Sequence, residues 1–187
     1  MAAHERVLEL ADILRELVKH KRIDQGVADQ CLRARGSFAG KQDIHPLEFI
    51  AQQKLDDQVR SGKKLDLETL SQWLAQWAEQ PYLRIDPLKI DVPAITSVMS
   101  YAFARRHSIL AVAVEADTLT IASAQPFVRE WEANLAHTTR RTIKRVVVNP
   151  AEIERFTTEF YRLAHSVSGA SYNEYGNTGV GNFEQLL

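Results

Sequence analysis

The segment Gly36–Gln42 (Gly-Ser-Phe-Ala-Gly-Lys-Gln) has the glycines and the lysine of a phosphate-binding loop. That pattern needs one more residue between its glycines, a serine or threonine after its lysine, and a β-strand in front. Here Gln42 occupies the hydroxyl position, and the residues before Gly36 have the spacing of a helix. The segment is therefore predicted to be an ordinary loop, and nucleotide hydrolysis is not assigned to it.

The other reactive residue types also lack the spacing of a catalytic or metal site. Cys31, the single cysteine, falls on the apolar face of a predicted helix and is interpreted as a small buried hydrophobe. Adjacent acids such as Asp56 and Asp57 are typical of a capped or solvated helix end. No two of the six histidines are four residues apart (His4, His20, His45, His107, His137, His165). The sequence therefore predicts no catalytic residue, no cofactor-binding residue and no metal ligand.

Two basic clusters are the candidates for contact with a partner or a small anion. Arg105, Arg106 and His107 end a predicted helix, where cations also suit the helix dipole. Arg140 and Arg141 lie between a predicted helix and a predicted strand, where solvated charges are the favoured interpretation and a small anion or partner patch is the alternative. The formal net charge is only −1, so a strongly basic nucleic-acid-binding surface is not predicted.

The composition is that of an ordinary globular protein, with 45% hydrophobic residues in a chain of 187. No apolar run approaches the roughly 18–20 residues that span a bilayer. A single cysteine excludes a disulfide framework and fits a reducing compartment. We therefore expect a cytoplasmic protein without direct membrane insertion, which reaches a membrane only through a partner.

The amino-terminal part of the chain is predicted to be all helical. Asp24 and Asp66 are placed to cap the second and fourth helices, and Pro46 suits the first turn of the third. A polar corner recurs after the first and third helices, starting at Lys21 and at Lys54. The predicted buried face of the first helix consists of Val7, Leu10, Leu14, Leu17 and Val18.

The middle part of the chain predicts the order β-α-β-β-α-β-α, with one small sheet and helices packed on it. Helices are expected to begin at Asp91, Pro126 and Asn149, and Leu163 is placed on the buried stripe of the last. The apolar end of the last strand favours a central position in the sheet. The predicted strands are Tyr82–Ile85, Ile109–Glu115, Thr118–Ala124 and Thr142–Val148.

The fold class is therefore predicted to be α+β, in three regions. Residues 1–80 form a helical subdomain, and residues 81–165 form a small mixed subdomain. Residues 166–187, rich in serine, glycine and asparagine, read as a flexible linker. The linker ends in the apolar Asn182–Leu187, which suggests that another domain would follow.

Several segments together resemble one protein family. Pro81–Asp91 (Pro-Tyr-Leu-Arg-Ile-Asp-Pro-Leu-Lys-Ile-Asp) resembles that family's Pro-Tyr-x-x-Leu/Ile-Asp-Pro-x-x-Ile/Val-Asp segment. Arg105–Leu110 is similar to its Arg-Arg-His-x-Val/Ile-Leu stretch, Asp117–Ala122 to its hairpin, and Asn182–Leu186 to the lead-in to its motor domain. The chain thus resembles the amino-terminal regulatory and docking region of type II secretion and type IV pilus assembly ATPases.

The resemblance implies a non-catalytic domain that docks the motor onto the cytoplasmic part of an inner-membrane platform protein. ATP and magnesium would then belong to a motor domain outside this chain. In some members the region binds cyclic di-GMP through a repeated pattern that begins Arg-Leu-Gly and has a later glycine. In helical register the two copies here would start at Asp12 and Ile44, with Lys21 and Gln53 at the later glycine positions. Docking is therefore the favoured function, and cyclic di-GMP sensing is the alternative.

Overall fold

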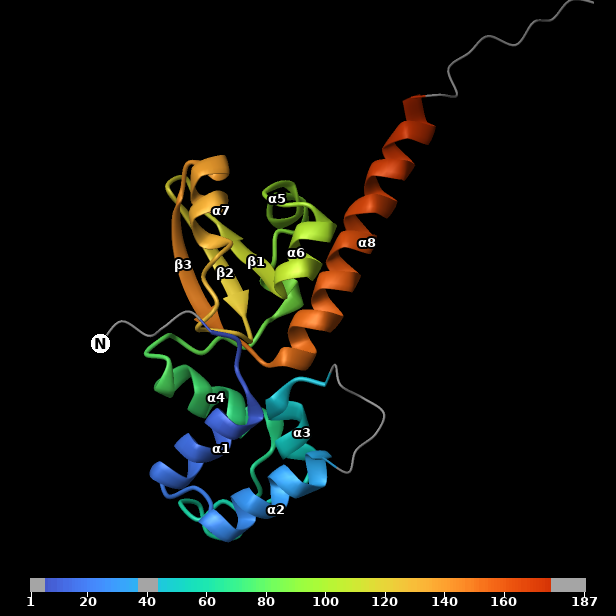
Figure 1. Ribbon diagram of the computed structural model, residues 1–187. Coiled ribbons are helices and arrows are strands. Elements are labelled where there is room, and N and C mark those ends of the chain that lie inside the picture. Colours follow the sequence, from blue (N-terminus) through green and yellow to red (C-terminus); the bar gives the residue numbers. More distant parts are fainter. Residues whose placement is uncertain (1–5, 37–43, 176–187) are drawn as a thin grey trace, which may run out of the picture.

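The computed structural model describes residues 6–36 and 44–175, with side chains up to residue 167. Within these ranges the chain has a lower helical unit and an upper unit in which helices pack on a small sheet (Figure 1). The predicted α+β class is confirmed. Gly36 is the last residue of a helix, and the rest of the segment predicted as a glycine loop lies outside the described residues. The helices are α1 (Leu10–Lys19), α2 (Gln25–Gly36), α3 (Pro46–Gln52), α4 (Leu67–Trp77), α5 (Val92–Ser97), α6 (Tyr101–His107), α7 (Glu132–Thr139) and α8 (Pro150–Tyr175), with a 3-10 turn η1 (Pro87–Lys89).

Local capping signals fix the ends of two helices in the helical unit (residues 6–80). Asp66 Oδ1 accepts a hydrogen bond from the backbone N–H of Thr69 at 2.7 Å, as predicted for the start of α4. Pro46 occupies the first turn of α3, also as predicted. Asp24 precedes α2, but its carboxylate accepts from the side chain of Gln58 instead of capping the helix.

The buried face of α1 differs from the prediction at its first residue. The helix begins at Leu10, so Val7 precedes it and is 64% exposed. Ile13, which the prediction omitted, is fully buried beside Leu14 and Leu17. The helical period is the same as predicted, but its start was placed one turn too early.

The sheet has three strands in the order β1-β2-β3: β1 (Ile109–Val114), β2 (Thr118–Ser123) and β3 (Thr142–Val147). β1 and β2 form the predicted antiparallel hairpin, and β3 runs parallel to β2. The prediction of a central β3 was wrong, because β2 holds the middle position. The apolar end of β3 is buried instead by the helical unit, since Val147 belongs to that unit's hydrophobic cluster.

The segment predicted as a first strand, Tyr82–Ile85, is not a strand of the sheet. It makes a single parallel bridge between Tyr82 and Val147. Leu83 N donates to Val147 O at 2.8 Å, and Val147 N donates to Pro81 O at 2.8 Å. The segment Tyr82–Ile85 therefore pairs with β3 only at the end of that strand.

Two helices of the upper unit (the α+β unit, residues 81–175) begin or break elsewhere than predicted. The helix expected from Asp91 is divided into α5 and α6, because Ser100 Oγ accepts from Phe103 N at 3.1 Å and caps a new helix. The helix expected from Pro126 begins only at Glu132. α7 packs against β3, whereas α5, α6 and α8 pack beside β1 (Figure 1).

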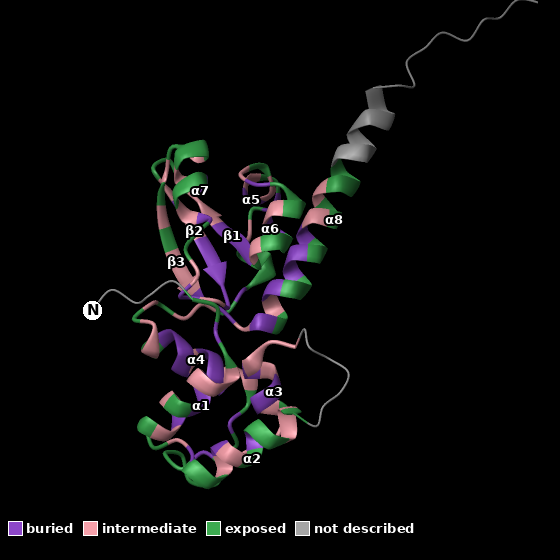
Figure 2. Cartoon of the chain, viewed as in Figure 1, coloured by how far each residue is buried: buried purple, intermediate pink, exposed green. Residues whose placement is uncertain are grey.

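The last helix, α8, starts as predicted and runs further than predicted. Asn149 Oδ1 accepts from Ala151 N at 3.0 Å and Pro150 is the first helical residue. The helix continues to Tyr175, past the boundary placed at residue 165. Its far part extends beyond the sheet, so Leu163, predicted to be buried, is 51% exposed (Figure 2).

The two units have separate hydrophobic clusters that meet at their junction. Phe127 and Val147 of the α+β unit are packed in the cluster of the helical unit, and the Phe127 ring lies 4.9 Å from the Trp77 ring. Trp73 and Trp131 are buried, which confirms that these tryptophans pack in the core. The junction is therefore apolar at its centre, and polar contacts surround it.

Candidate binding cleft

A cavity of about 610 Å³ opens at the junction of the two units. The helical unit contributes residues 7–10, the end of α2 and the start of α3. The α+β unit contributes the end of α6, the residues after β2 and the first turns of α8. Sites that bind ligands or partners favour such junctions between structural units. This cavity is therefore the candidate site, and we call it the cleft.

His45 joins the two units beside the cleft. Its Nδ1 accepts a hydrogen bond from Leu47 N at 3.2 Å, so this nitrogen carries no proton. Its Nε2 therefore carries the proton and donates to Ala124 O, 3.1 Å away in the α+β unit. Burial lowers the pKa of His45 to about 4, although the Ala124 carbonyl acts in the opposite direction. The imidazole is thus neutral at physiological pH and holds the start of α3 against the end of β2.

The residues before α1 make a second connection between the units. Leu8 N donates to the side-chain oxygen of Gln125 at 2.9 Å, and Arg6 N donates to Phe127 O at 3.4 Å. The Arg6 guanidinium lies 6.0 Å from the centre of the Trp77 ring and 5.8 Å from that of Phe127. This segment of the helical unit is consequently fastened along the rim of the cleft.

The cleft carries charged groups from both units. Glu48 of α3 and Glu154 of α8 both line it. Burial, and then the nearby charge of Glu154, raise the pKa of Glu48 above its ordinary value. Arg35 also lines the cleft, and its guanidinium packs 5.0 Å from the centre of the Phe49 ring. The site can therefore bind a polar or charged ligand by electrostatic contact.

The described part of the chain holds no metal-binding cluster, and its cysteine is buried. No group of three or more metal-binding side chains occurs among the described residues. Cys31 is buried, and burial raises the pKa of its thiol to about 11, which keeps it protonated and unreactive. The interpretation of Cys31 as a buried hydrophobe is confirmed.

The first predicted basic cluster lies at the end of α6, next to the cleft. Arg105 lines the cleft, whereas Arg106 is exposed. His107 Nδ1 lies 3.2 Å from a carboxylate oxygen of Glu130. His107 thus contacts Glu130 of the same chain, and Arg105 and Arg106 remain the candidates for contact with a partner.

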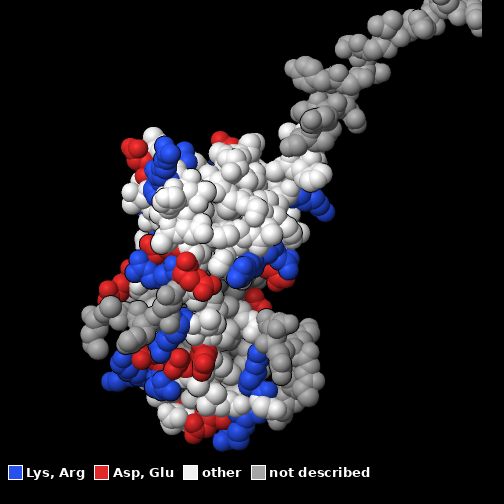
Figure 3. Space-filling model, turned by 45° about the horizontal axis from the view of Figure 1, so that its top comes forward, with Lys and Arg blue, Asp and Glu red and all other residues white. Residues whose placement is uncertain are grey.

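The second predicted cluster lies at the opposite end of the sheet. Ile109, which follows α6, pairs with Ser123 at one end of β2, whereas Thr142 pairs with Thr118 at the other end. Arg141 Nε donates to Glu115 O at 2.8 Å, and Arg140 is exposed. The structure therefore does not bring the two clusters together. On the face in Figure 3, basic and acidic side chains lie together in mixed groups, a wide uncharged area covers part of the upper unit, and no single basic patch is seen.

The sequence predictions missed the residues that shape the cleft: His45, Glu48, Glu154 and Thr157. The His45–Pro46 pair at a helix start was the one local signal, because a side chain before a first-turn proline commonly caps the helix. The two glutamates come from α3 and α8, which are distant in sequence. No local pattern could have placed them in one site.

Comparisons with known proteins agree with the fold and with the predicted resemblance. Residues 78–167 match the MshEN domain family. The chain is 42% identical over 146 residues to the type IV pilus assembly ATPase TfpB of Acinetobacter baylyi, a match that covers 76% of this chain and 25% of TfpB. The chain thus spans about a quarter of that relative's length.

Two solved structures match the chain, and the first of them shares its fold. A structure of MshE with cyclic di-GMP ("cdg") has a TM-score of 0.56 and 17% identity, and the match covers 82% of this chain and 99% of that one. The N-terminal domain of XpsE has a TM-score of 0.42 and 14% identity, with 82% and 97% covered.

These findings confirm the predicted resemblance. Residues 78–167 match the MshEN domain model, and the chain is similar to part of a type IV pilus assembly ATPase. The residues that match the MshEN domain, 78–167, follow the helical unit along the chain. No helix in the described ranges combines the length and the apolar character that crossing a membrane requires.

Proposed function

We propose that this chain is a non-catalytic docking domain that attaches a pilus-assembly or secretion ATPase to the cytoplasmic part of its inner-membrane platform protein. The similarity to the amino-terminal region of a pilus ATPase carries the proposal. ATP and magnesium would act in the motor domain of the full-length protein, and no residue described in this chain is assigned to them. The protein would work in the cytoplasm and reach the membrane through its partner.

The contacts at the junction support this role. His45, Gln125 and Phe127 each take part in a hydrogen bond between the helical unit and the α+β unit. Tyr82 Oη also donates to Glu68 Oε2 of α4 at 2.7 Å. A docking domain must present a defined surface to its partner, and several contacts between its halves suit it to that task.

Two exposed features are the proposed contact points for the platform protein. Leu88 lies in the family-like segment 81–91 and is 94% exposed, so its whole side chain is open to a partner surface. Arg105 and Arg106 at the end of α6 offer positive charge to an acidic partner surface. The predictions also named His107, Arg140 and Arg141 as contacts. These three residues would lie at the margin of the proposed contact surface or outside it.

The test is direct binding to the purified cytoplasmic domain of the cognate platform protein, measured by biolayer interferometry. A complex that forms at or below tens of micromolar is expected. Leu88→Asp and Arg106→Glu should each weaken it, whereas Lys19→Glu, an exposed change on α1, should not. Absence of a complex at that concentration would refute the docking function.

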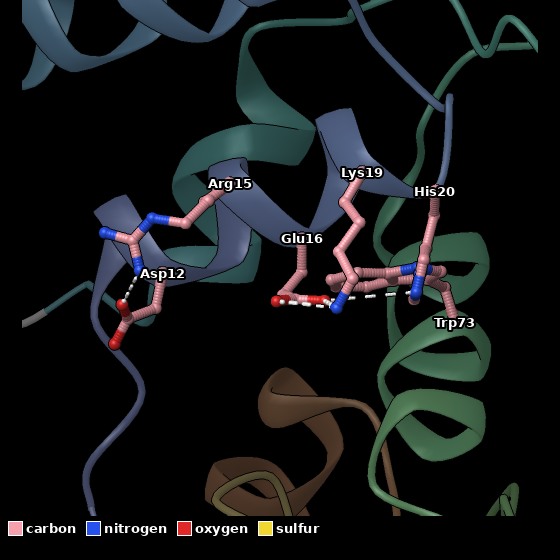
Figure 4. A network of polar contacts seen from close by, with 6 residues as sticks. All are labelled: Asp12, Arg15, Glu16, Lys19, His20 and Trp73. Atoms are coloured by element: carbon pink, nitrogen blue, oxygen red, sulfur yellow. Dashed lines mark hydrogen bonds and ion pairs between the residues drawn. The ribbon is translucent and has the colours of Figure 1, made fainter.

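Cyclic di-GMP sensing is the second candidate, favoured by the fold similarity to MshE. The residues at the positions of the nucleotide pattern argue against it. At the first position Asp12 forms ion pairs with Arg15 at 2.8 Å and with Arg6 at 3.2 Å. Figure 4 shows the Asp12–Arg15 pair on α1, the helix that also carries the Glu16–Lys19 pair. A carboxylate held in this way repels a phosphate where the pattern has an arginine.

The backbone conformation favours an alignment in which the second copy of the nucleotide pattern starts one residue later than the sequence predicted. Lys21 follows α1 in the left-handed conformation, with φ 55°, and Lys54 follows α3 with φ 51°. Lys54, and not Gln53, therefore corresponds to Lys21, and the second copy starts at His45 instead of Ile44. Both positions where glycine would be favoured hold lysine. Isothermal titration calorimetry with cyclic di-GMP decides the matter, since micromolar binding would establish the alternative.

A further inference from the structure

Two carboxylates line the cleft without an ion pair to any described residue. Glu48 comes from the helical unit and Glu154 from the α+β unit, and both line the same cavity. Within the described residues, neither carboxylate takes part in a hydrogen bond or an ion pair. Many other acids of the chain do, such as Glu16 with Lys19 and Asp86 with Lys89. The charge of this pair is therefore not balanced by a direct ionic contact among the described residues.

A buried hydroxyl beside these carboxylates also lacks a partner. Thr157 lines the cleft less than one turn after Glu154, is 2% exposed, and its hydroxyl has no hydrogen bond among the described residues. Helical threonines usually bond to the carbonyl four residues back. Thr158 does so with Glu154 O at 3.1 Å, and Thr139 does so with Leu135 O at 2.8 Å. An unpaired buried hydroxyl is costly and indicates a missing donor or acceptor.

The other charged groups that line the cleft do not supply that missing partner. Arg35 packs over the Phe49 ring, and one of its nitrogens lies 3.5 Å from Ile44 O. Arg105 lies 3.3 Å from the hydroxyl oxygen of Tyr101. Among the described residues no ion pair joins either arginine to Glu48 or Glu154, His45 is neutral near pH 7, and Glu9 adds a further negative charge at the rim. The cleft thus presents acceptors on two walls.

We propose that the cleft binds the guanidinium group of an arginine side chain supplied by a partner protein, held between Glu48 and Glu154 with Thr157 as a further acceptor. A guanidinium is planar and offers five donors, so it can bridge two carboxylates that approach from different walls. A cavity of about 610 Å³ has room for such a side chain. The binding site stands on the geometry, whereas a protein as the source of the cation rests on the proposed docking function.

The bound cation would also strengthen the junction. Glu48 and Glu154 belong to different units and repel each other when no cation lies between them. A guanidinium between them replaces that repulsion with two attractions across the junction. Binding of the partner would therefore tighten the contact between the helical unit and the α+β unit.

Nuclear magnetic resonance titration tests the site with a defined probe. The peptide acetyl-Gly-Arg-Gly-amide is added to the ¹⁵N-labelled chain, with the same peptide carrying neutral citrulline as control. Amide shifts should appear in α3 and the first turns of α8, and should be much weaker with citrulline. Glu48→Gln or Glu154→Gln should weaken binding by about tenfold or more, the value of a charge-assisted hydrogen bond. Glu159→Gln, elsewhere on α8, should leave binding unchanged.

Two results would overturn the site: no arginine-dependent shifts at the cleft, or equal weakening by all three variants. A further arm distinguishes the source of the cation. Glu48→Gln should also weaken binding of the platform protein's cytoplasmic domain by about tenfold. If the platform binds equally well to both forms, docking stands and the assignment of the arginine to that partner fails. If free guanidinium ion binds the cleft as tightly as the peptide, a protein source is likewise contradicted.

Discussion

Acidification should weaken the junction between the two units through His45. The imidazole must stay neutral in the folded chain, because its Nδ1 accepts from Leu47 N while its Nε2 donates to Ala124 O. A proton on Nδ1 would make that nitrogen a donor facing the Leu47 N–H, which is also a donor, and the hydrogen bond would be lost. Burial accordingly lowers the pKa of His45 from 6.5 to about 4. The unfolded chain binds this proton more readily, so stability is present at higher pH and is lost as the pH falls from 6.5 towards 4.

The size of the effect follows from the two pKa values. A difference of about 2.5 units corresponds to at most about 3 kcal/mol of unfolding free energy, at about 1.4 kcal/mol per unit. Between pH 7 and pH 5 the loss should be up to about 2 kcal/mol. Glu48 acts with the opposite sign, since its raised pKa makes the folded chain bind the proton more readily.

The assay is urea unfolding followed by the fluorescence of the three tryptophans at pH 7, 6 and 5. His45→Asn is the control, because asparagine can still cap α3 but does not titrate in this range. The contribution of Glu48 is present in both proteins and cancels in the difference between them. The wild-type chain should lose up to about 2 kcal/mol more than the variant between pH 7 and 5. Equal losses in the two proteins would refute the role given to His45.

Four further outcomes are expected. The thiol of Cys31 should resist Ellman's reagent at pH 8 until the chain is unfolded in urea, because burial raises its pKa to about 11. Lys21→Gly should raise the unfolding free energy in urea by up to about 1 kcal/mol, since glycine relieves a left-handed backbone. Arg22→Met should cost about 3 kcal/mol or more in the same assay, because Asp57 would lose its buried partner 2.8 Å away. Thr157→Val should leave the thermal midpoint unchanged or raise it slightly, since its hydroxyl makes no hydrogen bond among the described residues.

Features that depend on neighbouring residues were predictable from the sequence. Asp66 and Asn149 each precede a helix whose free N–H groups their side chains satisfy, so both helix starts were placed correctly. The hairpin of β1 and β2 was also predicted, because its alternating apolar residues lie on either side of a two-residue turn. Family resemblance came from the combination of short segments and was confirmed by the match over residues 78–167.

Features that depend on distant parts of the chain were not predictable in this way. The apolar end of β3 suggested a central strand, but Val147 is covered by the helical unit instead of by a fourth strand. Leu163 follows the apolar period of α8, yet the helix continues past the sheet that would bury it. Glu48 and Glu154 meet only because α3 and α8 pack against the same cleft. Local patterns show which face of an element is apolar, and tertiary packing decides what covers it.

The docking function is tested most directly by one affinity measurement. Isothermal titration calorimetry of this chain with the cytoplasmic domain of its platform protein, followed by cyclic di-GMP in the same buffer, compares both candidate ligands. Docking predicts a platform complex with a dissociation constant at or below tens of micromolar and no heat from cyclic di-GMP. Micromolar binding of cyclic di-GMP with no platform complex would contradict it.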